Sequence, residues 1–266
     1  MFENLAQLPD SVLTGVVFFF GLCVGSFANV VIYRWPLEKS VVTPRSSCPN
    51  CGTALSWYEN IPVLSYLVLR GKCRSCHVGI SIRYPLVELL TGVLLALVFV
   101  VNGRSWTTIE YIILVAALIP ASVIDLDHFL LPDVITLPGL AIGLGGAALN
   151  PERSFWESLL GALLGGGFLW SIGAIYRNVR KQEGMGGGDI KLLAWLGAVL
   201  GWQAIPFVII VASLSGSVLG LALAPAQQRG LKTVIPFGPY LAAAALLCVL
   251  GGQGWAHTYL SWFIPL

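Results

Sequence analysis

The chain has 266 residues, of which 56% are hydrophobic and 11% are charged, and its formal net charge is +2. Soluble domains carry roughly 25% charged residues, so this composition excludes an ordinary soluble domain and indicates a membrane protein. The small net charge and the lack of basic stretches interleaved with aromatic residues give no indication of a nucleic-acid partner. The first apolar run follows no basic region and carries no small-residue cleavage site, so we expect no cleavable signal peptide.

Apolar stretches recur along the whole chain, and a membrane-spanning helix needs about 20 such residues. They predict an all-α polytopic membrane protein with about eight transmembrane helices, of which the sixth is short. The sequence leaves open whether the last span continues into Trp255–Phe263. The predicted spans are Val12–Tyr33, Leu86–Val101, Ile109–Ile124, Val134–Leu149, Leu159–Tyr176, Ile190–Leu200, Ile205–Ala224 and Tyr240–Leu250.

The basic residues predict the orientation of these spans. When the connecting segments are assigned alternately to two sides, thirteen of the fifteen Lys and Arg residues fall on one side, and Arg104 and Arg153 fall on the other. Basic segments stay in the cytoplasm, so the richer side is predicted to be cytoplasmic. That side includes the polar block between the first two spans and, near the end of the chain, Arg229 and Lys232. With eight spans, both termini are expected in the periplasm.

The polar block contains two Cys-x-x-Cys pairs separated by 21 residues. Four thiolates at such spacing can hold one Zn²⁺ tetrahedrally, about 2.3 Å from each sulfur, and they leave no open position for a catalytic water. We therefore predict a structural zinc site. The alternatives are reduced thiols or a redox pair. Persistent disulfides are not expected in the cytoplasm. The predicted ligands are Cys48, Cys51, Cys73 and Cys76. Two further cysteines, Cys23 and Cys248, are predicted to be buried small apolar residues.

A glycine-rich stretch, Gly184–Gly188, precedes Asp189 at the entrance to the sixth predicted span. Consecutive glycines disfavour a helix, so we predict a flexible loop that ends on this aspartate. Acidic groups within membrane proteins are costly and are frequently functional. The predicted topology brings Asp125 and Asp127 to the same membrane boundary, where two carboxyl groups sharing one proton can activate water. The alternatives are a helix cap for Asp189 and a solvated turn for the other two.

Several stretches, taken together and in this order, resemble the bacterial prepilin peptidases, which are leader peptidase/N-methyltransferases of type IV pilus and type II secretion systems. The resemblance extends over most of the chain, although each stretch alone is weakly diagnostic. The stretches are Gly25–Arg34, the two cysteine pairs with Asn60–Tyr66 between them, Ile80–Gly92, Asp125 with Leu131–Asp133, Gly186–Asp189 and Ile235–Pro239.

The resemblance implies an aspartic membrane protease of the bacterial inner membrane, with Asp125 and Asp189 as the catalytic pair and Asp127 in reserve. Asp133, at the start of the fourth span, better suits a capping role. The family cleaves the basic leader of prepilins or pseudopilins on the cytoplasmic side and then methylates the new N-terminal amine with S-adenosylmethionine. The implied partners are these substrates and membrane lipid. The sequence gives no oligomeric state.

The methyl-donor site is not assigned by any spacing in the sequence. Weak candidates are Glu59, Asn60, Arg70 and Glu88. The resemblance implies a first transmembrane helix (1–33), a zinc domain associated with methyl transfer (34–84) and a seven-helix protease domain (85–266). We also hypothesise that the glycine loop opens for substrate and then closes. Two other functions stay open from the residues alone, an ion-coupled secondary transporter and a non-catalytic membrane assembly scaffold.

Overall fold

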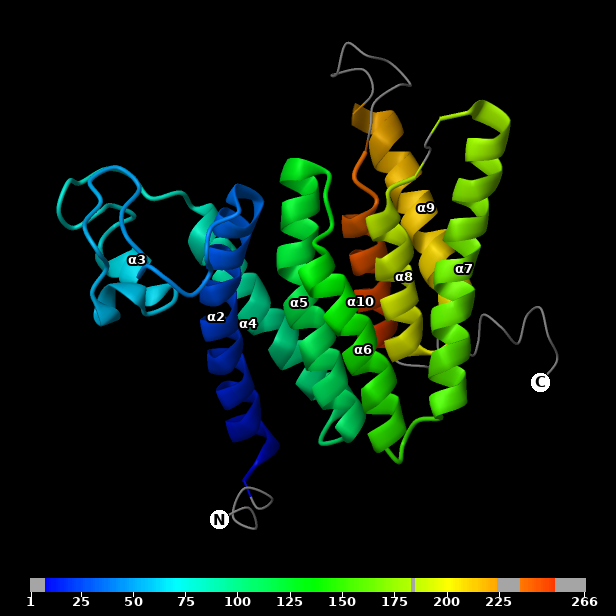
Figure 1. Ribbon diagram of the computed structural model, residues 1–266. Helices are drawn as coiled ribbons and strands as arrows, with labels where there is room; N and C mark the ends of the chain where they lie inside the picture. The colour runs from blue at the N-terminus through cyan, green and yellow to red at the C-terminus, as the bar shows by residue number, and fades with distance from the viewer. Residues whose placement is uncertain (1–7, 183–184, 224–234, 252–266) are drawn as a thin grey trace. The chain divides into compact units, whose positions relative to one another are not determined.

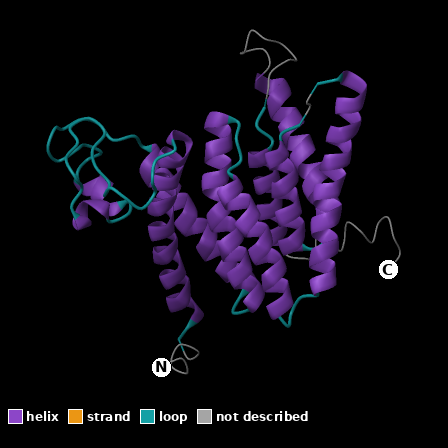
Figure 2. Cartoon of the chain, in the orientation of Figure 1, coloured by secondary structure: helices purple, strands orange, loops and turns teal. Residues whose placement is uncertain are grey.

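The structure is a computed structural model that describes residues 8–182, 185–223 and 235–251. Within these ranges the regular structure is helical, apart from two isolated β-bridges, Ser47–Ala54 and Lys72–Gly79 (Figure 2). Five of the described helices are long and apolar enough to cross a membrane. The prediction of an all-α membrane protein is therefore confirmed. The predicted continuation into residues 255–263, Arg229, Lys232 and Gly184 lie outside the described residues.

Each predicted span coincides with one helix of the structure, and most boundaries agree within a few residues (Figure 1). Three of these helices, α6, α8 and α10, have 17, 14 and 14 residues, fewer than the roughly 20 that a full span needs. The apolar helices are α2 (Asp10–Arg34), α4 (Arg83–Asn102), α5 (Trp106–His128), α6 (Asp133–Leu149), α7 (Phe155–Arg180), α8 (Gly187–Leu200), α9 (Ala204–Leu223) and α10 (Gly238–Gly251). Short helical segments between α2 and α4 are η1 (Trp35–Leu37), η2 (Trp57–Asn60) and α3 (Leu64–Val68).

The chain divides into two compact units, Met1–Gly103 and Arg104–Leu266. In the first unit, glycines allow α2 and α4 to approach closely. A Cβ atom on Gly21 would lie 2.7 Å from the Cα of Gly92, and one on Gly25 would lie 2.7 Å from the Cα of Glu88. Larger side chains at these positions would force the two helices apart, which is the usual role of small residues between membrane helices.

In the second unit, α8 packs against α5, α6, α7, α9 and α10. Its contact with α7 is so close that a Cβ atom on Gly161 would meet the carbonyl oxygen of Gly197 at 2.2 Å. On the α6 side, Gly139 makes room for the indole ring of Trp195, which is 1% exposed. The helix that carries Asp189 is therefore held by tight packing on several sides.

The glycine-rich stretch differs from its prediction. Gly187 and Gly188 are the first residues of α8, and Gly186 is the N-cap, so the prediction of a loop reaching Asp189 is wrong for these residues. Packing explains the difference, because tertiary contacts offset the low helix propensity of glycine. A side chain at Gly188 is also excluded, since its Cβ atom would lie 2.7 Å from the Cβ atom of Leu131.

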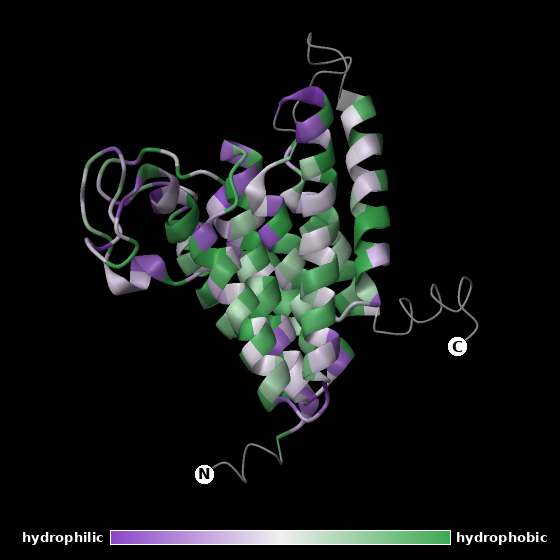
Figure 3. Cartoon of the chain, turned by 45° about the vertical axis from the view of Figure 1, so that its right-hand side comes forward, coloured by the Kyte–Doolittle hydropathy of each residue, from purple (hydrophilic) through white to green (hydrophobic). Residues whose placement is uncertain are grey.

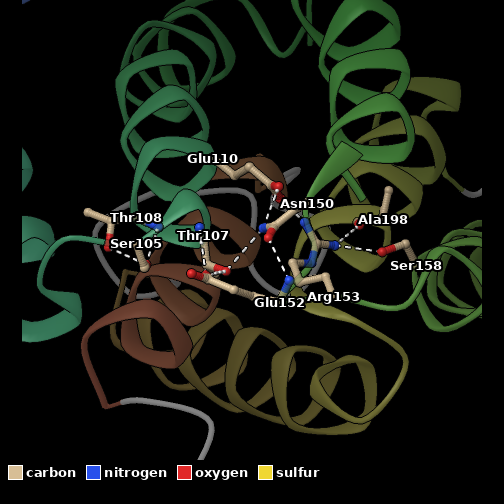
Figure 4. A network of polar contacts seen from close by, with 9 residues as sticks. All are labelled: Ser105, Thr107, Thr108, Glu110, Asn150, Glu152, Arg153, Ser158 and Ala198. Atoms are coloured by element: carbon tan, nitrogen blue, oxygen red, sulfur yellow. Dashed lines mark hydrogen bonds and ion pairs between the residues drawn. The ribbon is translucent and has the colours of Figure 1, made fainter. Parts of the chain in front are cut away.

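The ends of α5, α6, α7 and α8 opposite to Asp189 are joined by a buried polar network, the Arg153 network (Figure 4). The guanidinium of Arg153 pairs with Glu110, and these side chains are 9% and 10% exposed. Arg153 also donates to Ser158 Oγ at 2.6 Å and to the carbonyl oxygen of Ala198, in the last turn of α8. Asn150 donates to Glu110 Oε1 at 3.0 Å. Burial lowers the pKa of Arg153 to about 10, so the group stays charged at neutral pH.

Hydrophilic residues mark both ends of the long helices in this unit, with apolar residues between them (Figure 3). This distribution fits helices that cross the apolar layer of a bilayer. Cys23 in α2 is exposed and Cys248 in α10 is partly exposed, so the prediction that both are buried is wrong. An apolar helix in lipid has no need to bury a thiol, because the surrounding solvent is itself apolar.

Candidate active site

Asp125 lies in the last turn of α5 and is only 5% exposed. Its carboxyl Oδ2 accepts a 3.0 Å hydrogen bond from the backbone N–H of Gly238, the first residue of α10. A Cβ atom on Gly238 would lie 2.6 Å from the same oxygen. Glycine at this position therefore lets the start of α10 approach the carboxyl group and fix its orientation.

Asp189 lies in the first turn of α8 and is partly buried. Its carboxyl group is close enough to Asp125 for the two charges to interact. The structure thus brings together the two aspartates that the sequence singled out, 64 residues apart in the chain. Asp189 is not the N-cap residue of its helix, since that position belongs to Gly186.

Leu131 connects the surroundings of the two aspartates. This residue follows α5 and is 8% exposed. Its side chain lies against Gly188, next to Asp189, and against Gly238, the hydrogen-bond donor to Asp125. The two glycines therefore accommodate one leucine between the first turns of α8 and α10.

The other two acidic candidates are placed differently. Asp127 is exposed in α5, and a displacement of two residues turns it about 200° around the helix axis from Asp125. Asp133 is the first residue of α6, after the N-cap Pro132, and both of its carboxyl oxygens lie 2.7 Å from Lys191 Nζ. Asp133 thus pairs with a cation two residues beyond Asp189, a contact that the sequence analysis missed.

A cavity of about 270 Å³ lies between α7 and the start of α8. Two of its lining residues, Gly187 and Ile190, flank Asp189 in the chain. The lining is mostly apolar, with Arg177 as a cationic member. The remaining lining residues are Trp170, Gly173, Ala174 and Met185.

The four cysteines of the polar block form a compact cluster whose sulfur atoms all lie within 4.8 Å of one another. Sγ of Cys48 is 3.8 Å from Sγ of Cys76, and Sγ of Cys51 is 4.0 Å from Sγ of Cys73. Sulfurs at about 2.3 Å from a common tetrahedral centre are about 3.8 Å apart. The donor set and its size therefore fit one metal ion held by four thiolates.

Both halves of the cluster have the same backbone geometry. The N–H of Cys48 donates to the Thr53 carbonyl at 2.9 Å, and the N–H of Cys73 donates to the Val78 carbonyl at 2.9 Å. Hydrogen bonding with the Thr53 side chain lowers the pKa of the Cys51 thiol to about 6. This shift favours the thiolate, the form that binds metal ions.

Comparison with known proteins identifies the family. Residues 112–221 match the type IV leader peptidase family, and residues 19–102 match the bacterial peptidase A24 N-terminal domain. A prepilin leader peptidase/N-methyltransferase of Aeromonas hydrophila is 41% identical over an alignment of 273 positions, which covers 94% of this chain and 94% of the relative. The chain belongs to the type IV leader peptidase family.

Other members of the family are similarly close. The protein of the same name from Pseudomonas aeruginosa is 41% identical over 90% of this chain and 91% of its own length. The one from Myxococcus xanthus is 45% identical over 80% of this chain and 64% of its own length. No solved structure matches the chain. Membership and the apolar helices together indicate a multi-pass protein of the inner membrane.

In this leader peptidase homologue, two of the candidate methyl-donor residues have local partners. Glu59 completes a capping box with Ser56 at the start of η2, where Glu59 Oε2 accepts from the Ser56 N–H at 2.8 Å. Glu88 in α4 accepts a 2.7 Å hydrogen bond from the N–H of Val63. Asn60 and Arg70 are exposed. Glu59 and Glu88 therefore each have a structural contact within the first unit, and the residues of the methyl-donor site stay unassigned.

Proposed function

We propose that this protein removes the leader peptide from type IV prepilins or pseudopilins and then methylates the new N-terminal amine. The observation that carries the proposal is the meeting of Asp125 and Asp189 in a chain that belongs to the type IV leader peptidase family. The relatives named prepilin leader peptidase/N-methyltransferase match this chain over most of its length. Neither an ion-coupled transporter nor a scaffold is favoured by these relationships.

For peptide cleavage, we propose that Asp125 and Asp189 act as an aspartate pair sharing one proton. The ionised carboxylate takes a proton from a water molecule, which attacks the scissile carbonyl carbon. The protonated partner donates its proton to the carbonyl oxygen. When the tetrahedral intermediate collapses, the carboxyl group that took the proton from water donates it to the leaving amine. The other carboxylate takes a proton from a hydroxyl of the intermediate as the new carbonyl group forms, so the pair again holds one proton.

The surroundings of the pair support this role. The Gly238 N–H holds one oxygen of Asp125 at 3.0 Å, which limits rotation of the carboxyl group. Asp189 is carried by a helix that is packed on several sides. A catalytic pair depends on such fixed geometry, because rate enhancement falls steeply when reacting groups are misplaced. This placement weakens the gating hypothesis for Gly187 and Gly188, since both are part of the packed helix.

We further propose that the eight apolar helices all lie in the membrane, with both termini in the periplasm and the aspartate pair at the cytoplasmic boundary. The distribution of Lys and Arg supports this orientation. Seven of these basic residues lie in the segment 34–83. A second group lies at the C-terminal end of α7, namely Arg177, Arg180 and Lys181. A prepilin presents its basic leader at this boundary and its apolar segment to the bilayer.

We propose that the cluster of four cysteines holds a structural Zn²⁺. The donor set fits this ion, and four thiolates complete its tetrahedral coordination. Bound zinc would hold the two Cys-x-x-Cys turns together, in a segment of the chain that lacks an extended apolar core. We associate this segment (34–84) with methyl transfer from S-adenosylmethionine, and residues 85–266 with peptide cleavage.

The function is tested by incubating the purified protein with a prepilin and S-adenosylmethionine in detergent, with mass spectrometry of the product. We expect loss of the leader mass followed by the gain of one methyl group on the new N-terminus. An intact prepilin after incubation with folded, zinc-containing protein would contradict the proposed function. Cleavage without methyl gain would contradict the methyl-transfer half alone.

A further inference from the structure

The short helix α3 exposes an apolar face that neither the aspartate pair nor the cysteine cluster explains. Leu64, Leu67 and Val68 are 55%, 64% and 73% exposed. These positions are related as i, i+3 and i+4, so the three side chains lie on one side of the helix. Three large apolar side chains that share an exposed face in a polar segment indicate contact with something apolar.

A hydrogen bond fixes the level of α3 along the apolar helix α4. The N–H of Val63, the residue before α3, donates to Glu88 Oε2 at 2.7 Å. Glu88 lies five residues after the start of α4, a distance of about 7.5 Å along the helix axis. A helical side chain points toward the N-terminus of its helix, so Val63 lies between the level of Glu88 and the first residue of α4. The start of α3 is therefore level with the first turns of a membrane-spanning helix.

The charges next to α3 suit the headgroup region of a bilayer. Arg70, Lys72 and Arg74 follow the helix directly, and all three are exposed. Trp57, in η2, is 79% exposed. An apolar helical face with cations beside it and an aromatic side chain nearby is typical of segments that lie in the interface of a membrane and attract anionic lipid.

We infer that α3 is an interfacial helix, whose Leu64, Leu67 and Val68 side chains enter the lipid leaflet in which α4 begins. The occupant of this face is membrane lipid, and the neighbouring cations contact lipid phosphates. The cysteine cluster is then held at the membrane surface, because η2 and α3 lie between its two pairs in the chain. This inference does not depend on the peptidase or methyltransferase activity.

Val42 provides a matched control within the same polar segment. This side chain is apolar and 80% exposed, as the α3 residues are. The loop that carries it has a different anchor, since the side chain of Arg34, the last residue of α2, donates to the carbonyl oxygens of Ser40 at 3.0 Å and Arg45 at 3.4 Å. If exposure alone decided contact with lipid, Val42 and Leu67 would be labelled equally. The hydrogen bond from Val63 to Glu88 holds only α3 beside the first turns of α4, so we expect lipid contact at Leu67.

Photo-crosslinking tests the inference in the full chain. The photoreactive amino acid benzoylphenylalanine replaces Leu67, Val42 or Phe19, the last being an exposed residue of α2. Each protein is placed in vesicles of phosphatidylethanolamine and phosphatidylglycerol and illuminated, and adducts are identified by mass spectrometry. Retained zinc content shows that each variant is folded.

We expect lipid adducts at position 67 in a yield comparable to position 19, and at least about tenfold fewer at position 42. Failure of position 67 to label lipid while position 19 labels it would overturn the inference. Equal lipid labelling at positions 42 and 67 would also overturn it, since the level of α3 would then have no effect. A protein adduct at position 67, from a second copy or from added prepilin, in place of a lipid adduct would assign the face to that partner instead.

Discussion

The backbone N–H of Gly238 donates a 3.0 Å hydrogen bond to Asp125 Oδ2, and this contact joins the start of α10 to the end of α5. The two residues are 113 positions apart in the chain. The contact requires glycine, because a Cβ atom at this position would lie 2.6 Å from the carboxyl oxygen. The hydrogen bond restricts rotation of the Asp125 carboxyl group. Its oxygens therefore keep a fixed orientation relative to Asp189.

Gly188 and Gly187 offer a matched pair for testing the packing at Asp189. Gly188→Ala places a Cβ atom 2.7 Å from that of Leu131, whereas Gly187→Ala meets nothing within 4 Å. We expect Gly188→Ala to lower kcat for prepilin cleavage by about 10²-fold, because moving the Asp189 carboxyl group by about 1 Å disturbs its geometry relative to Asp125. Gly187→Ala should leave kcat nearly unchanged. Equal rates for the two variants would show that the Leu131 contact does not position Asp189.

The Arg153 network makes a prediction about stability. Arg153→Ala leaves Glu110 as a buried acid without its cation, and breaking a buried pair in this way costs about 3–5 kcal/mol. We expect a lower unfolding temperature in detergent. The double variant Glu110→Leu with Arg153→Met should recover much of the loss, because neither charge is then buried alone. If the double variant loses as much stability as the two single variants lose together, the ion pair is ruled out as the cause.

The sequence predicted the positions of the apolar helices well, since long apolar stretches have few alternatives in a membrane protein. It also predicted the cysteine cluster, because two Cys-x-x-Cys turns constrain their sulfurs locally. The aspartates were found through the resemblance and the topology together. What the residues alone did not show was that the two carboxyl groups lie close enough for their charges to interact.

The features that sequence reasoning missed depend on contacts between distant segments. Gly187 and Gly188 are helical, and the close approach of Gly188 to Leu131 is a tertiary contact that no local propensity reveals. The pairing of Asp133 with Lys191 joins α6 to α8 over 58 positions. Arg153 appeared only as a charge in the orientation count, although it binds three other segments.

The metal prediction concerns the first unit of the chain. Cys76→Ser removes one ligand of the proposed zinc site, so we expect loss of bound zinc and faster proteolysis of residues 34–84. Cys23→Ser is the matched control, since Cys23 is an exposed thiol in α2 outside the cluster. Zinc content is measured by atomic emission and proteolysis by mass spectrometry. Full stability and activity of the Cys76→Ser protein without metal would refute a structural role.

The most direct test of the central claim is prepilin cleavage by three single variants, Asp125→Asn, Asp189→Asn and Asp127→Asn, each followed by mass spectrometry of the product. The unfolding temperature in detergent confirms that each protein is folded. We predict that Asp125→Asn and Asp189→Asn lower the cleavage rate by about 10⁴-fold or to the detection limit, because either change removes one acid of the pair. Asp127→Asn should cleave at a rate close to that of the unchanged protein. Substantial cleavage by folded Asp125→Asn or Asp189→Asn protein would contradict the account.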